Sequence, residues 1–108
     1  MMKRGEIWWV NFESELRGET SKARPAIIVS NDAANKNLNR VQIVPLTSNT
    51  GRLYPSEAYV RVGRRMSKAM ADQLTTASKR RILNKVGEIT PSELEAVEQA
   101  IRIQLDLR

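Results

Sequence analysis

The residues best suited to chemistry lie in two short segments. The first, Gly18 to Pro25, places an acid, Glu19, and an arginine, Arg24, at the end of a polar stretch, directly before the apolar run 25–30. A guanidinium stays charged at any physiological pH, and its planar fork can donate two hydrogen bonds to the oxygens of a phosphate. A structural explanation is also available, because Glu19 can be solvated while Arg24 caps a strand or pairs with an acid.

The second segment is Ile43 to Asn49, in which an apolar stretch stops abruptly at Thr47, Ser48 and Asn49. These three small polar side chains can donate hydrogen bonds to a ligand. Threonine, serine and asparagine also favour strand ends, where they form turns. Taken alone, the second segment therefore does not distinguish a binding site from a turn.

The composition excludes several kinds of catalytic site. The 108 residues include neither histidine nor cysteine, which removes thiolate nucleophiles, histidine general bases, histidine-based triads and the commonest zinc ligand.

The chain is basic, because lysine and arginine number 18 against 12 acidic residues. This excess suits a polyanionic partner but does not choose between RNA, DNA and a membrane surface. No apolar stretch approaches the roughly 20 residues that span a bilayer, so we expect one soluble, cytoplasmic domain over residues 1–108.

The residue pattern predicts a mainly β domain that must position the two segments. β-branched and aromatic residues mark the predicted strands, which we place at 6–12, 25–30, 41–46, 57–62, 70–76 and 81–86. Residues 13–23 and 47–56 are expected to be exposed loops, 31–39 a turn or short helix, and 63–67 a turn.

One helix is predicted at the C-terminal end of the chain. Thr90 is a suitable N-cap, Pro91 suits the first helical position, and Glu93 completes a capping box. The predicted buried stripe of this helix consists of Leu94, Val97, Ile101 and Leu105. Five or more strands followed by a helix favour a small, strongly bent antiparallel sheet or open barrel with the helix packed on it.

Taken in order, the motifs resemble those of the MazF/PemK family of bacterial toxins. The matching segments are 2–8, 18–19, 24–32, 44–48, 54–55, 72–73, 79–81 and 86–89, which together frame nearly the whole chain. The most specific parts are the pair Arg24-Pro25, which enters an apolar strand ending in Ser-Asn-Asp, and the pair Thr47-Ser48, which closes the next strand.

The resemblance implies a sequence-specific, metal-independent endoribonuclease, an mRNA interferase with a small SH3-like barrel of the CcdB/PemK type. It further implies a homodimer without a cofactor, and a small acidic MazE-like antitoxin whose disordered tail covers the RNA groove. Arg24 and Thr47 match the family's catalytic pair, and Glu19 matches a loop acid that is our candidate general base. RNA contact is expected from Thr20, Ser48, Asn49, Arg52, Tyr54 and Gln73.

The chemistry implied by the resemblance is self-consistent without histidine. RNA carries its own nucleophile, the 2′-OH, so the enzyme must align it, stabilise the added negative charge and protonate the leaving 5′ oxygen. The expected products carry 2′,3′-cyclic phosphate and 5′-hydroxyl ends. A single-stranded substrate is expected because paired bases cannot be splayed out and read.

Trp8 and Trp9 face opposite sides of their strand, so we expect one in the core and the other in the core or a dimer contact, not in base stacking.

Two other functions remain open from the residues. A CcdB-like toxin shares the predicted architecture and poisons DNA gyrase, but this chain ends Gln104-Leu105-Asp106-Leu107-Arg108 and lacks the terminal tryptophan-glycine-isoleucine of CcdB-like proteins. A non-catalytic RNA-binding barrel would need only the basic charge and the small β-rich domain. It would bind RNA in a salt-sensitive manner and cut nothing.

Overall fold

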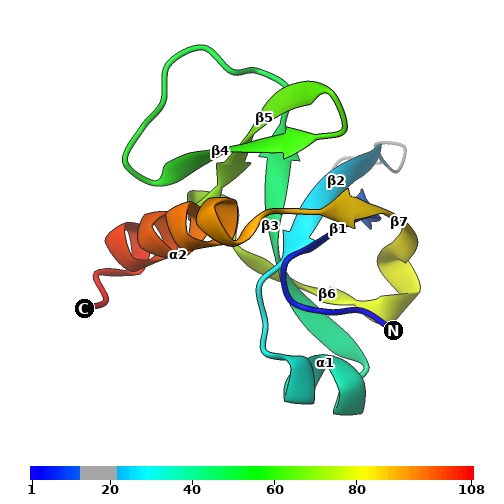
Figure 1. The fold of residues 1–108 in the computed structure, drawn as a ribbon. Helices are drawn as coiled ribbons and strands as arrows, with labels where there is room; N and C mark the ends of the chain where they lie inside the picture. Colours follow the sequence, from blue (N-terminus) through cyan, green and yellow to red (C-terminus); the bar gives the residue numbers. More distant parts are fainter. Residues whose placement is uncertain (13–21) are drawn as a thin grey trace, which may run out of the picture.

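A curled antiparallel sheet of seven strands and a C-terminal helix make up the protein (Figure 1). The computed structural model describes residues 1–12 and 22–108. The elements are β1 (Glu6–Phe12), β2 (Lys22–Ile28), α1 (Asp32–Asn37), β3 (Arg40–Thr47), β4 (Glu57–Val62), β5 (Arg65–Met70), η1 (Ala71–Gln73), β6 (Thr75–Ser78), η2 (Lys79–Arg81), β7 (Ile82–Glu88) and α2 (Pro91–Leu105). The predicted fold class, a strongly bent antiparallel sheet with a C-terminal helix, is confirmed.

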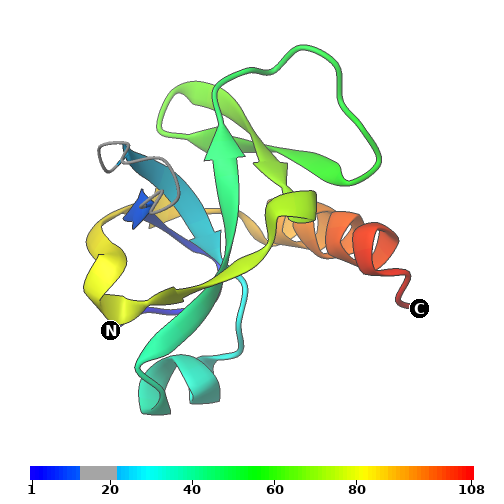
Figure 2. The same ribbon diagram turned by 180° about the vertical axis from the view of Figure 1, so that it is seen from behind.

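Strand β3 is the element around which the sheet bends. Its residues Arg40 to Ile43 pair with β6, whereas Leu46 and Thr47 pair with β5. On its other side, Ile43 to Pro45 pair with β2. Figure 2 shows β3 running from the α1 end, beside β6, to the β4–β5 hairpin. Because one strand changes neighbours along its length, the sheet curls and does not lie flat.

The curl gives the sheet two apolar cores, one on each face. Ile27 and Val44 lie in a cluster beneath α2 with Val97, whereas the adjacent Ile28 and Ile43 lie in a second cluster on the opposite face. Successive side chains of a strand point to opposite faces. The centres of β2 and β3 are therefore buried on both sides, which accounts for their unbroken apolar sequences.

The sequence prediction was wrong between residues 63 and 76. We expected a turn over 63–67 and a strand over 70–76, but β5 spans Arg65–Met70, η1 follows it, and β6 begins at Thr75. At this point the chain leaves β4 and crosses to the far half of β3. The N–H of Ala71 donates to the carbonyl of Ser56 (3.0 Å), which fixes the bend. Neither glycine nor proline marks the bend, so no turn signal announced it.

Smaller differences from the prediction occur in β2 and α2. The strand expected at 25–30 begins at Lys22, because its pairing with β1 continues to the partner pair Phe12 and Lys22. In α2, Val97 is buried and Leu94 and Ile101 are partly buried as predicted, but Leu105 is 49% exposed. Helix α2 packs against β4 and η1, and its last turn extends past them.

Glutamate 93 fixes both the start of α2 and its position on the sheet. The predicted capping box is present, because the Thr90 hydroxyl accepts the Glu93 N–H (3.2 Å) and the Glu93 carboxylate accepts the Thr90 N–H (2.8 Å). The other carboxylate oxygen accepts the N–H of Arg61 in β4 (2.6 Å). Burial acts to raise the pKa of Glu93, but these hydrogen bonds outweigh it and hold the pKa below its usual 4.5.

We therefore expect Glu93→Ala to lower the free energy of unfolding by about 1 to 2 kcal/mol, the range for losing a helix cap and a charged hydrogen bond. The pKa is lowered by folding, so the stabilisation is fully present above pH 4.5 and is lost as the pH falls through the lowered value. Urea unfolding at neutral and acid pH measures both effects. Glu95→Ala on the exposed side of the same helix is the control, and an equal loss in the two variants would contradict the prediction.

Candidate functional site

The candidate site lies where β2 and β3 part. Their pairing stops at Ala26 and Pro45. Beyond that pair, β2 continues along β1 through Pro25 to Lys22, while β3 turns to β5. Both strands carry a proline at the fork, and proline lacks the N–H that a further ladder bond between them would need. The two prolines thus end the pairing of β2 with β3, and the two predicted motifs lie on either side of the resulting gap in the sheet.

A cleft of about 490 Å³ fills this fork. The described residues that line it are Trp9, Ala23, Arg24, Pro25, Leu46, Thr47, Ser48, Val62, Arg65 and Ser67. Two guanidiniums and three hydroxyl groups therefore surround one space, and no acidic side chain lines the cleft within the described part of the chain. Such a lining attracts an anion.

Arg24 is one of the residues that line the cleft. The residue is exposed, and among the residues described it forms no hydrogen bond or ion pair. Its Cα partner in β1 is the buried Val10, so the backbone beneath Arg24 is held by the core. A fixed backbone and a guanidinium that is bonded to no other described residue can receive a phosphate without first breaking a contact within this part of the chain.

The hydroxyl of Thr47 is available as a donor. Thr47 is the last residue of β3, and its Oγ1 accepts the backbone N–H of Asn49 (3.2 Å). A hydroxyl has one proton and two acceptor lone pairs. Because the contact with Asn49 uses a lone pair, the proton remains free to be donated into the cleft. The same contact turns the chain at Ser48, which also lines the cleft.

The other predicted site residues that the structure describes lie in two different places. Arg52 and Tyr54 lie together in the β3–β4 loop, with the Arg52 Cζ 5.2 Å from the centre of the Tyr54 ring. The Asn49 carboxamide oxygen accepts the N–H of Gly51 (3.3 Å) in the same loop. Gln73 lies in η1, outside the cleft lining, with its Nε2 3.5 Å from the Met70 sulfur. Glu19 and Thr20 lie outside the described residues, and their assignment stays a prediction.

Trp9 is a cleft residue that sequence reasoning missed. We expected one tryptophan in the core and the other in the core or a dimer contact. Trp8 packs against the second core cluster and donates its indole N–H to Glu6 (3.0 Å), whereas Trp9 is 37% exposed and lines the cleft. Alternation along β1 showed that the two rings face opposite ways. It could not show that the Trp9 face would meet the fork.

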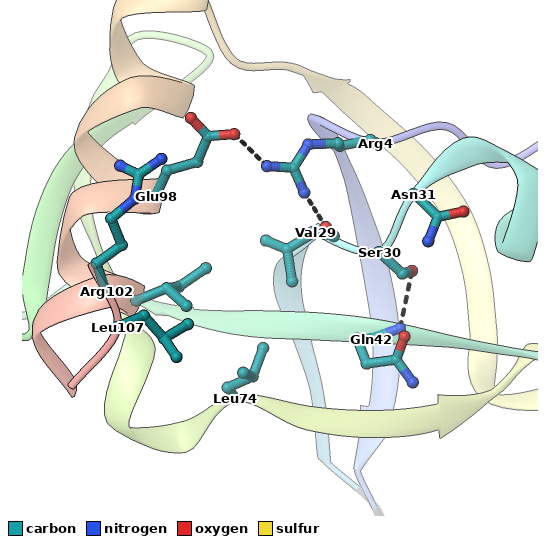
Figure 3. Close-up of a pocket in the computed structure, with 10 residues that line it drawn as sticks. Arg4, Val29, Ser30, Asn31, Gln42, Leu74, Glu98, Arg102 and Leu107 are labelled. Atoms are coloured by element: carbon teal, nitrogen blue, oxygen red, sulfur yellow. Dashed lines mark hydrogen bonds and ion pairs between the residues drawn. The ribbon is translucent and has the colours of Figure 1, made fainter. Parts of the chain in front are cut away.

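A second cleft, of about 470 Å³, lies between α2 and the end of β2 (Figure 3). The Arg4 guanidinium there donates to the Val29 carbonyl and to the Glu98 carboxylate, and it thereby joins the N-terminal segment to α2. The Ser30 hydroxyl accepts the Gln42 N–H (3.0 Å). Because Arg4 is already paired with groups of the chain itself, we interpret this cleft as a structural contact between the N-terminal segment and α2.

Within the described ranges, no group of three acidic, histidine or cysteine side chains could hold a metal ion. No helix found in these ranges is both long and apolar enough to cross a bilayer.

Residues 3–105 match the family described as the PemK-like, MazF-like toxin of type II toxin–antitoxin systems. The endoribonuclease MazF9 of Mycobacterium tuberculosis is 34% identical over an alignment 116 residues long. This alignment covers 99% of this chain and 98% of that protein. The endoribonuclease toxin MazF of Escherichia coli is 29% identical over 100 residues, covering 92% and 89% of the two chains.

Two solved structures show the same fold over their whole length. A mycobacterial endoribonuclease in complex with its cognate antitoxin aligns with a TM-score of 0.81 and 28% identity, covering 100% of this chain and 98% of that one. MazF from Deinococcus radiodurans aligns with a TM-score of 0.82 and 25% identity, covering 98% and 97%. These matches confirm the resemblance inferred from the motifs. The chain therefore belongs to the PemK-like, MazF-like toxin family of type II toxin–antitoxin systems, whose similar members are endoribonucleases.

Proposed function

We propose that the protein is a sequence-specific, metal-independent endoribonuclease that cuts single-stranded RNA as the toxin of a toxin–antitoxin pair. The observation that carries the proposal is the meeting of Arg24 and Thr47 in one cleft that no acidic side chain lines within the described residues. These two residues come from different strands, and only the parting of β2 and β3 brings them together.

In the proposed reaction, the 2′-oxygen attacks the adjacent phosphorus, and the bond from phosphorus to the 5′ oxygen breaks. A base removes the 2′-hydroxyl proton and the leaving oxygen gains a proton, so the products are a 2′,3′-cyclic phosphate and a 5′-hydroxyl. Arg24 would bind the non-bridging oxygens as negative charge builds on them, and Thr47 would donate a further hydrogen bond. Glu19 remains our candidate base, on the sequence argument alone.

The proposed partners follow from the same cleft. An acidic antitoxin segment would compete with RNA for Arg24 and Arg65, which is how a disordered MazE-like tail would cover the groove. Structures described as MazE–MazF complexes exist for Deinococcus radiodurans relatives of this fold. We propose that this toxin also acts in the cytoplasm as a homodimer.

The test is incubation of the purified protein with a long single-stranded RNA in EDTA, followed by mapping of the new ends. We expect cuts at a recurring short sequence, 5′-hydroxyl and cyclic phosphate ends, and protection of the same sequence within a duplex. Loss of cutting in the chelator would overturn metal independence. Intact RNA under all conditions would overturn the enzyme assignment, and a parallel gyrase supercoiling assay would then test the CcdB-like alternative.

Trp9 provides a direct optical test of where RNA binds. The indole lines the cleft and is 37% exposed, so an RNA base or phosphate there should change its fluorescence. We expect uncleavable RNA to change the emission of the Trp8→Phe variant, which retains Trp9, and to leave that of Trp9→Phe unchanged. A change that persists in Trp9→Phe would place RNA away from the cleft.

A further inference from the structure

The loop that leaves the cleft at Ser48 is held by a buried lysine of β5. Lys68 is only 6% exposed, yet it carries an ammonium group. Its Nζ donates to the backbone carbonyl of Arg52 (2.7 Å) and to the carboxylate of Glu57 (3.0 Å). These two acceptors lie on the far part of the β3–β4 loop and at the first residue of β4. Lys68 therefore ties both to the sheet.

This anchor also orients Tyr54. The Glu57 carboxylate that receives Lys68 accepts the backbone N–H of Tyr54 (2.9 Å). The Tyr54 ring lies 5.2 Å from the Arg52 Cζ and 6.0 Å from the Lys68 Nζ, within reach of cation–π attraction. The ring is nevertheless 51% exposed. An aromatic side chain that is held in place and still open to solvent is a stacking surface for an unpaired base.

The carboxylate of this ion pair, Glu57, is stabilised in its charged form. Burial acts to raise the pKa of Glu57, but the hydrogen bonds from Tyr54 and Lys68 outweigh it and hold the pKa below its usual 4.5. Glu57 is therefore ionised, and its charge compensates the buried ammonium of Lys68. A second contact supports the same loop, because the carbonyls of Thr50 and Gly51 share the one proton of the Tyr59 hydroxyl (3.2 Å to each).

Stability alone does not account for Lys68. Replacing both Lys68 and Glu57 by well-packed apolar side chains would often be neutral or stabilising, because both charges lose their hydration in the buried pair. Position 68 also lies next to the cleft. Its Cα partner in β3 is Thr47, and the preceding residue, Ser67, lines the cleft. One strand position thus connects the proposed catalytic threonine to the loop that carries Tyr54.

We propose that Lys68 is a positioning residue that holds Arg52 and Tyr54 as a subsite for an unpaired RNA base outside the cleft. The inference rests on the proposed function and deepens it, since it assigns substrate recognition to the β3–β4 loop. Lys68 itself does not touch the reacting atoms. It acts through the loop, so its removal weakens RNA binding and leaves the chemical step intact.

The test compares Lys68→Met with the wild-type enzyme on RNA oligonucleotides of increasing length around one mapped cut. On long substrates we expect KM to rise about tenfold, near the contribution of one stacked base. We expect kcat to stay within about twofold, because interactions away from the reacting atoms contribute equally to ground-state and transition-state binding. Lys68→Arg keeps the charge and the donors, so it should restore most of the affinity. The shortest cleaved oligonucleotide should not distinguish the variants.

Two further variants separate positioning from a general effect on folding. Tyr54→Leu removes the ring without disturbing the buried ion pair, and it should raise KM to the same extent. The double variant should be no worse than Lys68→Met alone, since Lys68 acts through the loop that carries Arg52 and Tyr54. Lys85→Met is the matched control, because Lys85 is ion-paired with Glu6 and Glu88 on the β1–β7 side of the sheet.

Each outcome decides the inference. A rise in KM that Tyr54→Leu reproduces and the double variant does not exceed supports it. An unchanged KM in Lys68→Met, a fall in kcat alone, or additive losses in the double variant would overturn it while leaving the enzyme assignment in place. A wild-type protein that leaves all RNA intact would overturn the proposed function, and the inference with it.

Discussion

Replacement of Arg24 by alanine is expected to lower the rate of RNA cleavage by about 10²- to 10³-fold, the loss seen when one donor to a developing oxyanion is removed. The guanidinium lines the cleft with Thr47 and forms no ion pair within the described residues. Its loss therefore removes a ligand for the phosphate without breaking a hydrogen bond or ion pair among those residues. Single-turnover cleavage of an oligonucleotide that contains one mapped site measures the effect.

Two variants sharpen this prediction. Arg24→Lys keeps the charge but lacks the planar fork, so it should recover only part of the rate. Arg40→Ala is the matched control, because Arg40 is an exposed arginine at the opposite end of β3 from Thr47, hydrogen-bonded to Asn39 (3.2 Å). Wild-type cleavage by a folded Arg24→Ala protein would remove Arg24 from the mechanism. An equal loss in Arg40→Ala would show that net charge alone matters.

The sequence was most informative where a segment has a single period and clear end signals. β1 begins and ends where the apolar and aromatic residues 6–12 predict, and α2 begins at the capping box of Thr90 and Glu93. In both cases local chemistry and burial require the same structure. The prediction failed where contacts between residues that are distant in the sequence determine the structure. The bend at η1 depends on the Ser56 carbonyl, fifteen residues before Ala71 in the sequence.

The candidate site also has features that the sequence shows and features that depend on the tertiary structure. The two motifs stood out in the sequence because Arg24-Pro25 and Thr47-Ser48 lie at the ends of apolar runs. Their meeting depends on the fork between β2 and β3, and prolines 25 and 45 can now be seen to mark it. The sequence alone predicts that Pro25 starts a strand. Its real position, opposite Trp9 within a longer strand, required knowledge of both neighbours.

The anchoring role of Lys68 could not have been derived from the sequence. A lysine between Ser67 and Ala69 in a short strand is ordinarily solvent-exposed. Its burial follows from the β3–β4 loop, which supplies a carbonyl at Arg52, and from the start of β4, which supplies a carboxylate at Glu57. The sequence contained the parts of this arrangement but not the loop conformation that joins them.

A substrate with 2′-deoxyribose at the nucleotide 5′ of the scissile phosphate is expected to bind and remain whole. The proposed reaction uses the 2′-oxygen of that nucleotide as its nucleophile, so removing one atom removes the reaction. Arg24 and Thr47 would still meet the phosphate, because both address oxygens that the analogue retains. We therefore expect wild-type affinity, measured by the Trp9 emission, with no detectable cut product in EDTA.

The matched control carries the same substitution at the nucleotide 3′ of the scissile phosphate. That 2′-hydroxyl cannot attack the scissile phosphorus in line, so cleavage should continue and yield a cyclic phosphate. If the first analogue were cut instead, the attacking oxygen would have to come from water, and the products would carry no cyclic phosphate. Such a result would exclude the 2′-oxygen as nucleophile. The role of the cleft would then change from orienting a group that the RNA brings to activating one that the protein must supply.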